Sequence, residues 1–210
     1  MTTEPTRHAL YWVPNALTLG RIASIPVLIA GVLLMGEGSL SGFGKPLFVI
    51  GLFVLAMITD FLDGFLARRW GLVSDFGRMI DPIADKLLVA AVLIALCIVT
   101  EGTWVLMVPA MAIIGRDILV SGAREHAALS GRVMPPTKLA KYKTACEMLG
   151  LLVLLVWLSS RALLPVDSFI PALVEYSGII GLTLIWIAAI LSVYTGSLYL
   201  RAALAKVADS

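Results

Sequence analysis

Four aspartates, Asp60, Asp63, Asp81 and Asp85, are spaced so that their carboxylates can meet. Asp60 and Asp63 are three residues apart, and Asp81 and Asp85 are four apart, so each pair lies on one face of a helix. Because a short connection joins the two segments, we expect the pairs to converge. Carboxylates at close range repel one another and therefore bind protons or cations.

The chemistry of the four carboxylates indicates which cation would bind. Hard oxygen ligands favour Mg²⁺, Mn²⁺ or Ca²⁺ over zinc, and no His or Cys lies close by in the sequence. Two divalent ions sharing four carboxylates would suit phosphoryl transfer. A simpler alternative is that the acids form ordinary ion pairs with Arg68, Arg69, Arg78 or Lys86, and the spacing alone leaves both interpretations open.

The composition indicates that lipid surrounds much of the chain. Of the 210 residues, 60% are hydrophobic and only 14% are charged, whereas a soluble domain carries about 25% charge. The mean hydropathy is +0.97. We therefore predict an all-α polytopic membrane protein that forms a single domain over residues 1–210, with no nucleic-acid partner.

Six apolar stretches are long enough to cross a hydrocarbon layer of about 30 Å. A short interfacial helix, ended or redirected by Pro14, is expected before them, since Tyr11 and Trp12 suit the headgroup layer. The six expected transmembrane helices are 17–35, 46–66, 82–100, 103–123, 142–164 and 177–200. The expected connections between them are 36–44, 68–80, 101–102, 127–141 and 161–171.

The distribution of Lys and Arg predicts the orientation of these helices. With the N-terminus in the cytoplasm, all Lys and Arg residues except Lys45 and Arg161 fall on the cytoplasmic side. The positive-inside rule therefore favours cytoplasmic N- and C-termini. The four aspartates lie at this same boundary of the membrane.

Small residues accompany the aspartates. Gly64 follows Asp63 inside a predicted helix, where glycine costs about 1 kcal/mol relative to alanine. Ala67 is also small, and Gly77 precedes the third predicted helix. Such residues would admit a flat nucleotide or phosphate group beside the acids, although close packing of membrane helices explains them equally well.

Together these residues match a family pattern. The segment Asp60-Phe-Leu-Asp-Gly-Phe-Leu-Ala-Arg68, followed by Gly77, Asp81 and Asp85, fits D-x2-D-G-x2-A-R-x8-G-x3-D-x3-D at every fixed position. It resembles the CDP-alcohol phosphotransferase family, whose members transfer a phosphatidyl or similar group from a CDP-linked donor to an alcohol and release CMP.

The resemblance implies roles for individual residues. Two divalent cations, Mg²⁺ or Mn²⁺, would be bound by Asp60, Asp63, Asp81 and Asp85, with Asp85 also serving as the general base. The CDP group of the donor would be contacted by Asn15, Thr18, Gly64, Ala67, Arg68, Ser74 and Gly77. The resemblance also suggests a homodimer in the bacterial inner membrane, with a cytoplasmic active site.

A basic cluster further along the chain suggests which alcohol accepts the group. Gly115-Arg-Asp-Ile-Leu-Val-Ser-Gly-Ala-Arg-Glu125 and the lysines that follow would suit an acceptor with its own phosphate. We expect the acceptor phosphate to contact Arg116, Arg124, Lys138 and Lys143. Anchoring to anionic lipid headgroups is the alternative for such cations.

This second motif resembles the branch of the family that makes phosphatidylglycerophosphate. That branch implies CDP-diacylglycerol as donor and sn-glycerol 3-phosphate as acceptor. Inositol phosphate, or phosphatidylglycerol as in cardiolipin synthesis, are alternative acceptors. A cation-coupled transporter would instead place its acids near the membrane midplane in repeated halves, and the sequence shows no such repeat.

Overall fold

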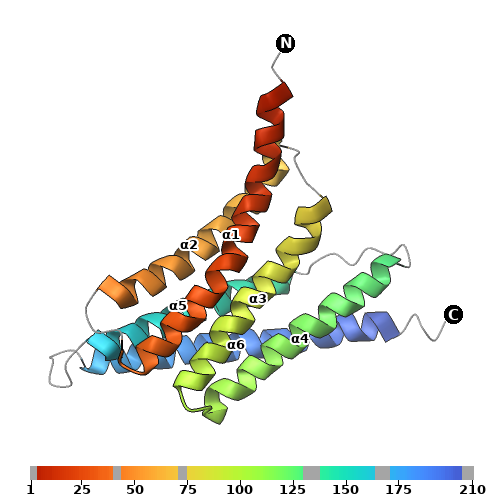
Figure 1. Ribbon diagram of the computed structural model, residues 1–210. Coiled ribbons are helices and arrows are strands. Elements are labelled where there is room, and N and C mark those ends of the chain that lie inside the picture. The colour runs from red at the N-terminus through yellow and green to blue at the C-terminus, as the bar shows by residue number, and fades with distance from the viewer. Residues whose placement is uncertain (1–3, 40–43, 71–74, 130–137, 164–170, 205–210) are drawn as a thin grey trace. The chain divides into compact units, whose positions relative to one another are not determined.

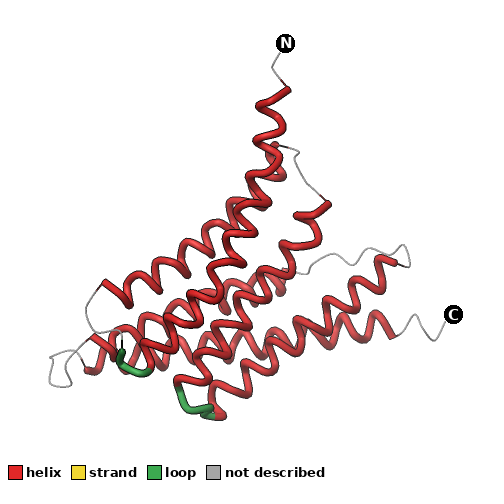
Figure 2. The backbone as a smooth tube through the Cα atoms, in the orientation of Figure 1, coloured by secondary structure: helices red, strands yellow, loops and turns green. Residues whose placement is uncertain are grey.

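The structure is a computed structural model that describes residues 4–39, 44–70, 75–129, 138–163 and 171–204. Within these ranges the chain is helical apart from short turns, and no strand occurs (Figure 2). The helices are α1 (Glu4–Gly36), α2 (Gly44–Trp70), α3 (Asp75–Val99), α4 (Trp104–Leu129), α5 (Lys138–Leu163) and α6 (Pro171–Leu204).

The prediction of a polytopic helical membrane protein is confirmed. Five of the described helices contain a segment long and apolar enough to cross a membrane: Asn15–Gly36, Met79–Val99, Trp104–Ala128, Leu139–Arg161 and Val174–Arg201. The remaining predicted span, 46–66, falls within α2. There, only residues 44–60 and 62 have described side chains.

The prediction of a separate interfacial helix before the first span was wrong. α1 is one helix from Glu4 to Gly36, and it continues through Pro14. A proline inside a helix removes one backbone hydrogen bond, but the turns on either side keep theirs. The aromatic residues Tyr11 and Trp12 therefore belong to the same helix as the first span.

The connections are shorter than hydropathy suggested. The expected connection 68–80 is replaced by helix up to Trp70 and again from Asp75. The connection 127–141 likewise gives way to helix up to Leu129 and from Lys138. Arginine and lysine are good helix formers, so charge ends the apolar run without ending the helix.

The chain divides into two compact units, each described here by itself. The first comprises residues 1–99 and 158–164, and the second comprises residues 100–157 and 165–210. In the first unit α1 packs against both α2 and α3 (Figure 1). Leu28 and Val32 of α1, Phe53 of α2, and Leu88 and Val92 of α3 are fully buried or nearly so. This packing fixes α1 beside the two helices that carry the aspartates.

In the second unit α4 packs along α6 (Figure 1). The indole Nε1 of Trp186 on α6 donates a hydrogen bond of 2.9 Å to the carbonyl of Val105 on α4. Gly181 lets α6 approach α5 closely, because a Cβ at Gly181 would lie 2.8 Å from Leu154 Cγ. Close approach at small residues is the usual packing of helices in lipid.

Candidate active site

Two of the predicted metal ligands converge on one atom of α1. Nη1 of Arg21 lies 2.7 Å from Oδ1 of Asp60 on α2 and 2.5 Å from Oδ1 of Asp85 on α3. The arginine side chain is completely buried, whereas those of Asp60 and Asp85 are 35% and 41% exposed. The two carboxylates therefore meet over a buried guanidinium and keep part of their surface accessible.

A third aspartate contacts the same face of α1. Thr18, one helical turn before Arg21, donates a hydrogen bond of 2.6 Å from Oγ1 to Oδ1 of Asp81. Residues three apart share a helix face, so Thr18 and Arg21 present their polar groups together. The three aspartates are thus positioned by α1 as well as by their own helices.

These donors fit a hard divalent cation. Asp60 and Asp85 already place one oxygen each around a positively charged atom, and oxygen donors are those that Mg²⁺ and Mn²⁺ prefer. Among the described residues no group of three or more His, Cys, Asp or Glu side chains is close enough to hold a metal. The fourth predicted ligand, Asp63, has a side chain that lies outside the described residues.

The predicted donor-binding residues are described only in part. Asn15 and Thr18 on α1 are 3% and 1% exposed, and Gly77 near the start of α3 is also buried. The remaining predicted donor contacts, Gly64, Ala67, Arg68 and Ser74, lie outside the residues or side chains that the structure describes.

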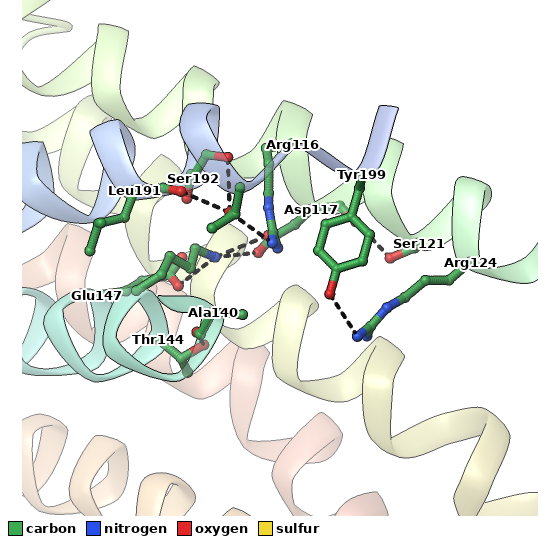
Figure 3. A network of polar contacts seen from close by, with 12 residues as sticks. Arg116, Asp117, Ser121, Arg124, Ala140, Thr144, Glu147, Leu191, Ser192 and Tyr199 are labelled. Carbon is green, nitrogen blue, oxygen red and sulfur yellow. Dashed lines mark hydrogen bonds and ion pairs between the residues drawn. The ribbon is translucent and has the colours of Figure 1, made fainter. Parts of the chain in front are cut away.

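In the second unit, two of the predicted acceptor cations, Lys143 and Arg116, contact carboxylates. Nζ of Lys143 on α5 lies 2.8 Å from Oδ2 of Asp117 on α4 and 2.7 Å from Oε2 of Glu147, one turn further along α5. Nη1 of Arg116 donates to Asp117 Oδ1 at 2.9 Å, and its Nη2 donates to Thr195 Oγ1 at 3.0 Å (Figure 3). Lys143 and Arg116 are thus paired with acids of the protein.

Arg124, the second arginine of the predicted acceptor site, is less completely satisfied than Arg116. Nη2 of Arg124 donates a long hydrogen bond, 3.4 Å, to the hydroxyl of Tyr199 on α6. The Tyr199 ring has Arg124 5.4 Å from its centroid on one side, and Arg116 lies 6.0 Å from the same centroid (Figure 3). Both distances are within the range of cation–π attraction. Lys138, the fourth predicted cation, begins α5, but its side chain lies outside the described residues.

A groove of about 400 Å³ runs between α4 and α6 beside Arg116. Its walls are mostly aliphatic, with Gly115, Gly196 and Tyr199 alongside the arginine. Gly196 makes room for that side chain, because a Cβ there would lie 2.8 Å from Arg116 Cγ. The glycine therefore helps to set the position of the guanidinium.

Several residues enter the two clusters that the sequence did not assign to a site. Arg21 counts only as one cytoplasmic cation from the sequence, although its spacing from Thr18 places both on one helix face. Asp117 stands out from the sequence only by sharing a stripe with Ser121 and Arg124. Glu147 and Tyr199 lie within apolar stretches. Glu147 follows Lys143 by four residues on α5, which helical spacing could have indicated, whereas only helix packing reveals Arg124 as the partner of Tyr199.

Comparison with known proteins finds similarity over most of the chain. The family model described as CDP-alcohol phosphatidyltransferase matches residues 11–194, which runs through both units. The match includes the four aspartates and the basic cluster.

Three relatives match this chain over 190 to 209 residues. A CDP-diacylglycerol–glycerol-3-phosphate 3-phosphatidyltransferase of Rickettsia bellii is 40% identical over 190 residues, covering 90% of this chain and 94% of the relative. A cardiolipin synthase (CMP-forming) of Oryza sativa is 36% identical over 209 residues, covering 94% of this chain but only 59% of the relative. An Arabidopsis thaliana phosphatidyltransferase with the same enzyme name as the Rickettsia protein is 40% identical over 200 residues, covering 90% of this chain and 62% of the relative.

Proposed function

The chain belongs to the CDP-alcohol phosphatidyltransferase family, and from this premise we propose that it transfers the phosphatidyl group of CDP-diacylglycerol to sn-glycerol 3-phosphate. The products are phosphatidylglycerophosphate and CMP. The observation that carries the proposal is the convergence of Asp60 and Asp85, from two helices, on one cationic atom. The names of the Rickettsia relatives, which the chain matches over nearly their full length, support the choice of acceptor. Membership of this family favours group transfer over cation-coupled transport.

In the proposed reaction, one bond to phosphorus forms, one bond to phosphorus breaks, and one proton is transferred. The acceptor hydroxyl oxygen attacks the phosphorus of the phosphatidyl group, and the bond from that phosphorus to the CMP oxygen breaks. Asp85 takes the hydroxyl proton, which makes the oxygen a better nucleophile. Two divalent cations, Mg²⁺ or Mn²⁺, would be held by Asp60, Asp63, Asp81 and Asp85 and would neutralise the diphosphate and the departing CMP.

Residues on α1 contact the acidic cluster. Thr18 donates a hydrogen bond to one oxygen of Asp81, and Arg21 lies against one oxygen each of Asp60 and Asp85 when no metal is bound. We assign the CDP group of the donor to Asn15, Thr18 and Gly77, together with Gly64, Ala67, Arg68 and Ser74. The acyl chains of the donor remain in the bilayer.

The acceptor phosphate is assigned to the basic cluster of the second unit. Arg116 and Lys143 already bind an anionic group, the carboxylate of Asp117. A guanidinium also offers two parallel donors to phosphate oxygens. Arg124 is the most available of the described cations in this cluster, because its Nη2 contacts a neutral hydroxyl, that of Tyr199, at 3.4 Å. Lys138 completes the proposed set.

The orientation of the protein in the membrane and its oligomeric state are also part of the proposal. The positive-inside distribution places the aspartates and both termini in the cytoplasm, and the Rickettsia relatives favour the inner membrane of a bacterium. A homodimer is proposed on the family resemblance alone.

One assay tests the proposed function directly. Purified full-length protein in mixed micelles is given CDP-diacylglycerol and Mg²⁺ or Mn²⁺, with sn-glycerol 3-phosphate, inositol phosphate or phosphatidylglycerol as acceptor. We expect CMP release and a new anionic lipid with sn-glycerol 3-phosphate, and loss of both in excess chelator. Preferential use of phosphatidylglycerol, the alternative acceptor for cardiolipin synthesis, would reject the proposed acceptor. Full activity in excess chelator would reject the metal assignment.

A further inference from the structure

A single nitrogen atom lies where two predicted metal ligands converge. Nη1 of Arg21 is within 2.7 Å of an oxygen of both Asp60 and Asp85. A divalent cation that bound these same two oxygens, at about 2.1 Å for Mg²⁺, would lie against this nitrogen. Nη1 of Arg21 and a divalent cation cannot both occupy this position. The two cations would therefore compete for the carboxylates of Asp60 and Asp85.

We propose that Arg21 acts as a positioning residue that substitutes for the divalent cation in the metal-free protein and is displaced from Asp60 and Asp85 when the metal binds. This inference rests on the proposed function only in taking these carboxylates as metal ligands. Arg21 keeps two carboxylates from different helices together when no metal holds them. Metal binding then exchanges one cation for another.

The position of Arg21 on α1 supports this role. Its side chain is completely buried, and the two carboxylates help to compensate the guanidinium charge. Asp60 and Asp85 remain more than one third exposed, so an ion can reach them from outside. One guanidinium carries a single positive charge against two negative charges, and the pair therefore still attracts a more highly charged cation.

Competition makes a prediction opposite to that of a permanent structural ion pair. If Arg21 must leave for the metal to bind, removing it strengthens metal binding. If Arg21 instead holds the carboxylates in place while the metal is bound, removing it weakens metal binding. The two cases can be separated without donor, acceptor or turnover.

The experiment measures Mn²⁺ binding to purified full-length protein by the electron paramagnetic resonance signal of free Mn²⁺. Arg21→Ala is compared with wild type and with Lys45→Ala, which removes the same charge from an exposed position at the start of α2. We expect Arg21→Ala to bind Mn²⁺ about threefold or more tightly than wild type, as for loss of a modest competing ion pair. Lys45→Ala should match wild type, and Asp60→Asn should lose affinity.

Added guanidinium ion tests whether a guanidinium group at the position of the Arg21 side chain competes with Mn²⁺. In Arg21→Ala, millimolar guanidinium chloride should weaken Mn²⁺ binding competitively, whereas potassium chloride at the same ionic strength should not. Unfolding temperatures in chelator should fall in Arg21→Ala, and Mn²⁺ should raise them more than in wild type. Arg21→Gln serves the same comparison if Arg21→Ala does not fold.

Two outcomes would overturn the inference. One is Mn²⁺ binding by the Arg21 variant that is equal to or weaker than that of wild type. The other is an effect of guanidinium no larger than that of potassium. Failure of the proposed function is separate, because it would appear as missing CMP release in a protein whose Mn²⁺ binding still responds to Arg21.

Discussion

Thr18 on α1 and Asp81 on α3 are joined by a hydrogen bond of 2.6 Å, although 63 residues separate them in the chain. The hydroxyl of Thr18 fixes one oxygen of a carboxylate that we assign to metal binding. Thr18→Val keeps the shape of the side chain and removes this donor. Because a hydrogen bond to a charged group contributes about 1.5–3 kcal/mol, we expect the Mn²⁺ concentration for half-maximal CMP release to rise about tenfold. Thr18→Ser should stay near wild type, and equal effects of both variants would contradict the role.

Asp85 is assigned the proton from the acceptor hydroxyl. Asp85→Asn removes the basic oxygen with little change of size, so we expect the rate of CMP release to fall at least about a hundredfold. Mn²⁺ binding, measured on the same preparation, should largely survive through the other carboxylates. Glu37→Gln, at an exposed position after α1, is the control for loss of an acid. Turnover of Asp85→Asn at a rate close to wild type would disprove the assignment as base.

Arg124 has the weakest contact among the described cations of the basic cluster. Arg124→Ala should raise the KM for sn-glycerol 3-phosphate about tenfold, since a charged hydrogen bond to phosphate is lost. The KM for CDP-diacylglycerol should change much less. Lys141→Ala removes the same charge from an exposed position on α5 and should leave both values unchanged. Equal increases in both KM values for Arg124→Ala would argue against an acceptor-phosphate site.

Lys143 compensates two acidic side chains, Asp117 and Glu147, in a buried position. Oε1 of Glu147 has no hydrogen-bond partner among the described residues, and the ion pair of Oε2 with Lys143 compensates the charge of that carboxylate. Lys143→Met should lower the free energy of unfolding by about 3 kcal/mol, because it leaves buried charge uncompensated. The measurement is denaturant unfolding in detergent. Lys143→Met/Glu147→Gln should recover part of the loss, and no recovery would mean that the pair is not the cause.

Gly196 and Gly122 provide a matched pair of glycine substitutions in the second unit. A Cβ at Gly196 would lie 2.8 Å from Arg116 Cγ, whereas a Cβ at Gly122 meets nothing within 4 Å. Gly196→Ala should therefore move Arg116 away from Asp117 and Thr195 and destabilise the protein by about 1–3 kcal/mol. Gly122→Ala should be neutral or stabilising by up to about 1 kcal/mol, as expected for alanine in a helix. Similar unfolding curves for the two variants would contradict the contact.

Much of the architecture follows from the sequence alone. Apolar stretches of sufficient length predicted the helices, because a backbone in lipid must satisfy its own hydrogen bonds. Their ends were less well predicted. Pro14 did not separate an interfacial helix from the first span, and helix continues to Trp70 past Arg68 and Arg69. Hydropathy reports the preference for lipid, whereas helix ends depend on backbone hydrogen bonding.

The sequence by itself determined the family of the protein and predicted which acids form its site. The spacing of Asp60, Asp81 and Asp85 is local information, because helical periodicity alone places such residues on one face. That spacing could not reveal Arg21 or Thr18 as their partners, nor Asp117 as a partner of Lys143. Those contacts join different helices, so only the packing of α1 on α2 and α3, and of α4 with α5, decided them. Short-range spacing fixes which side chains share a face, but helix packing decides which opposite charge that face meets.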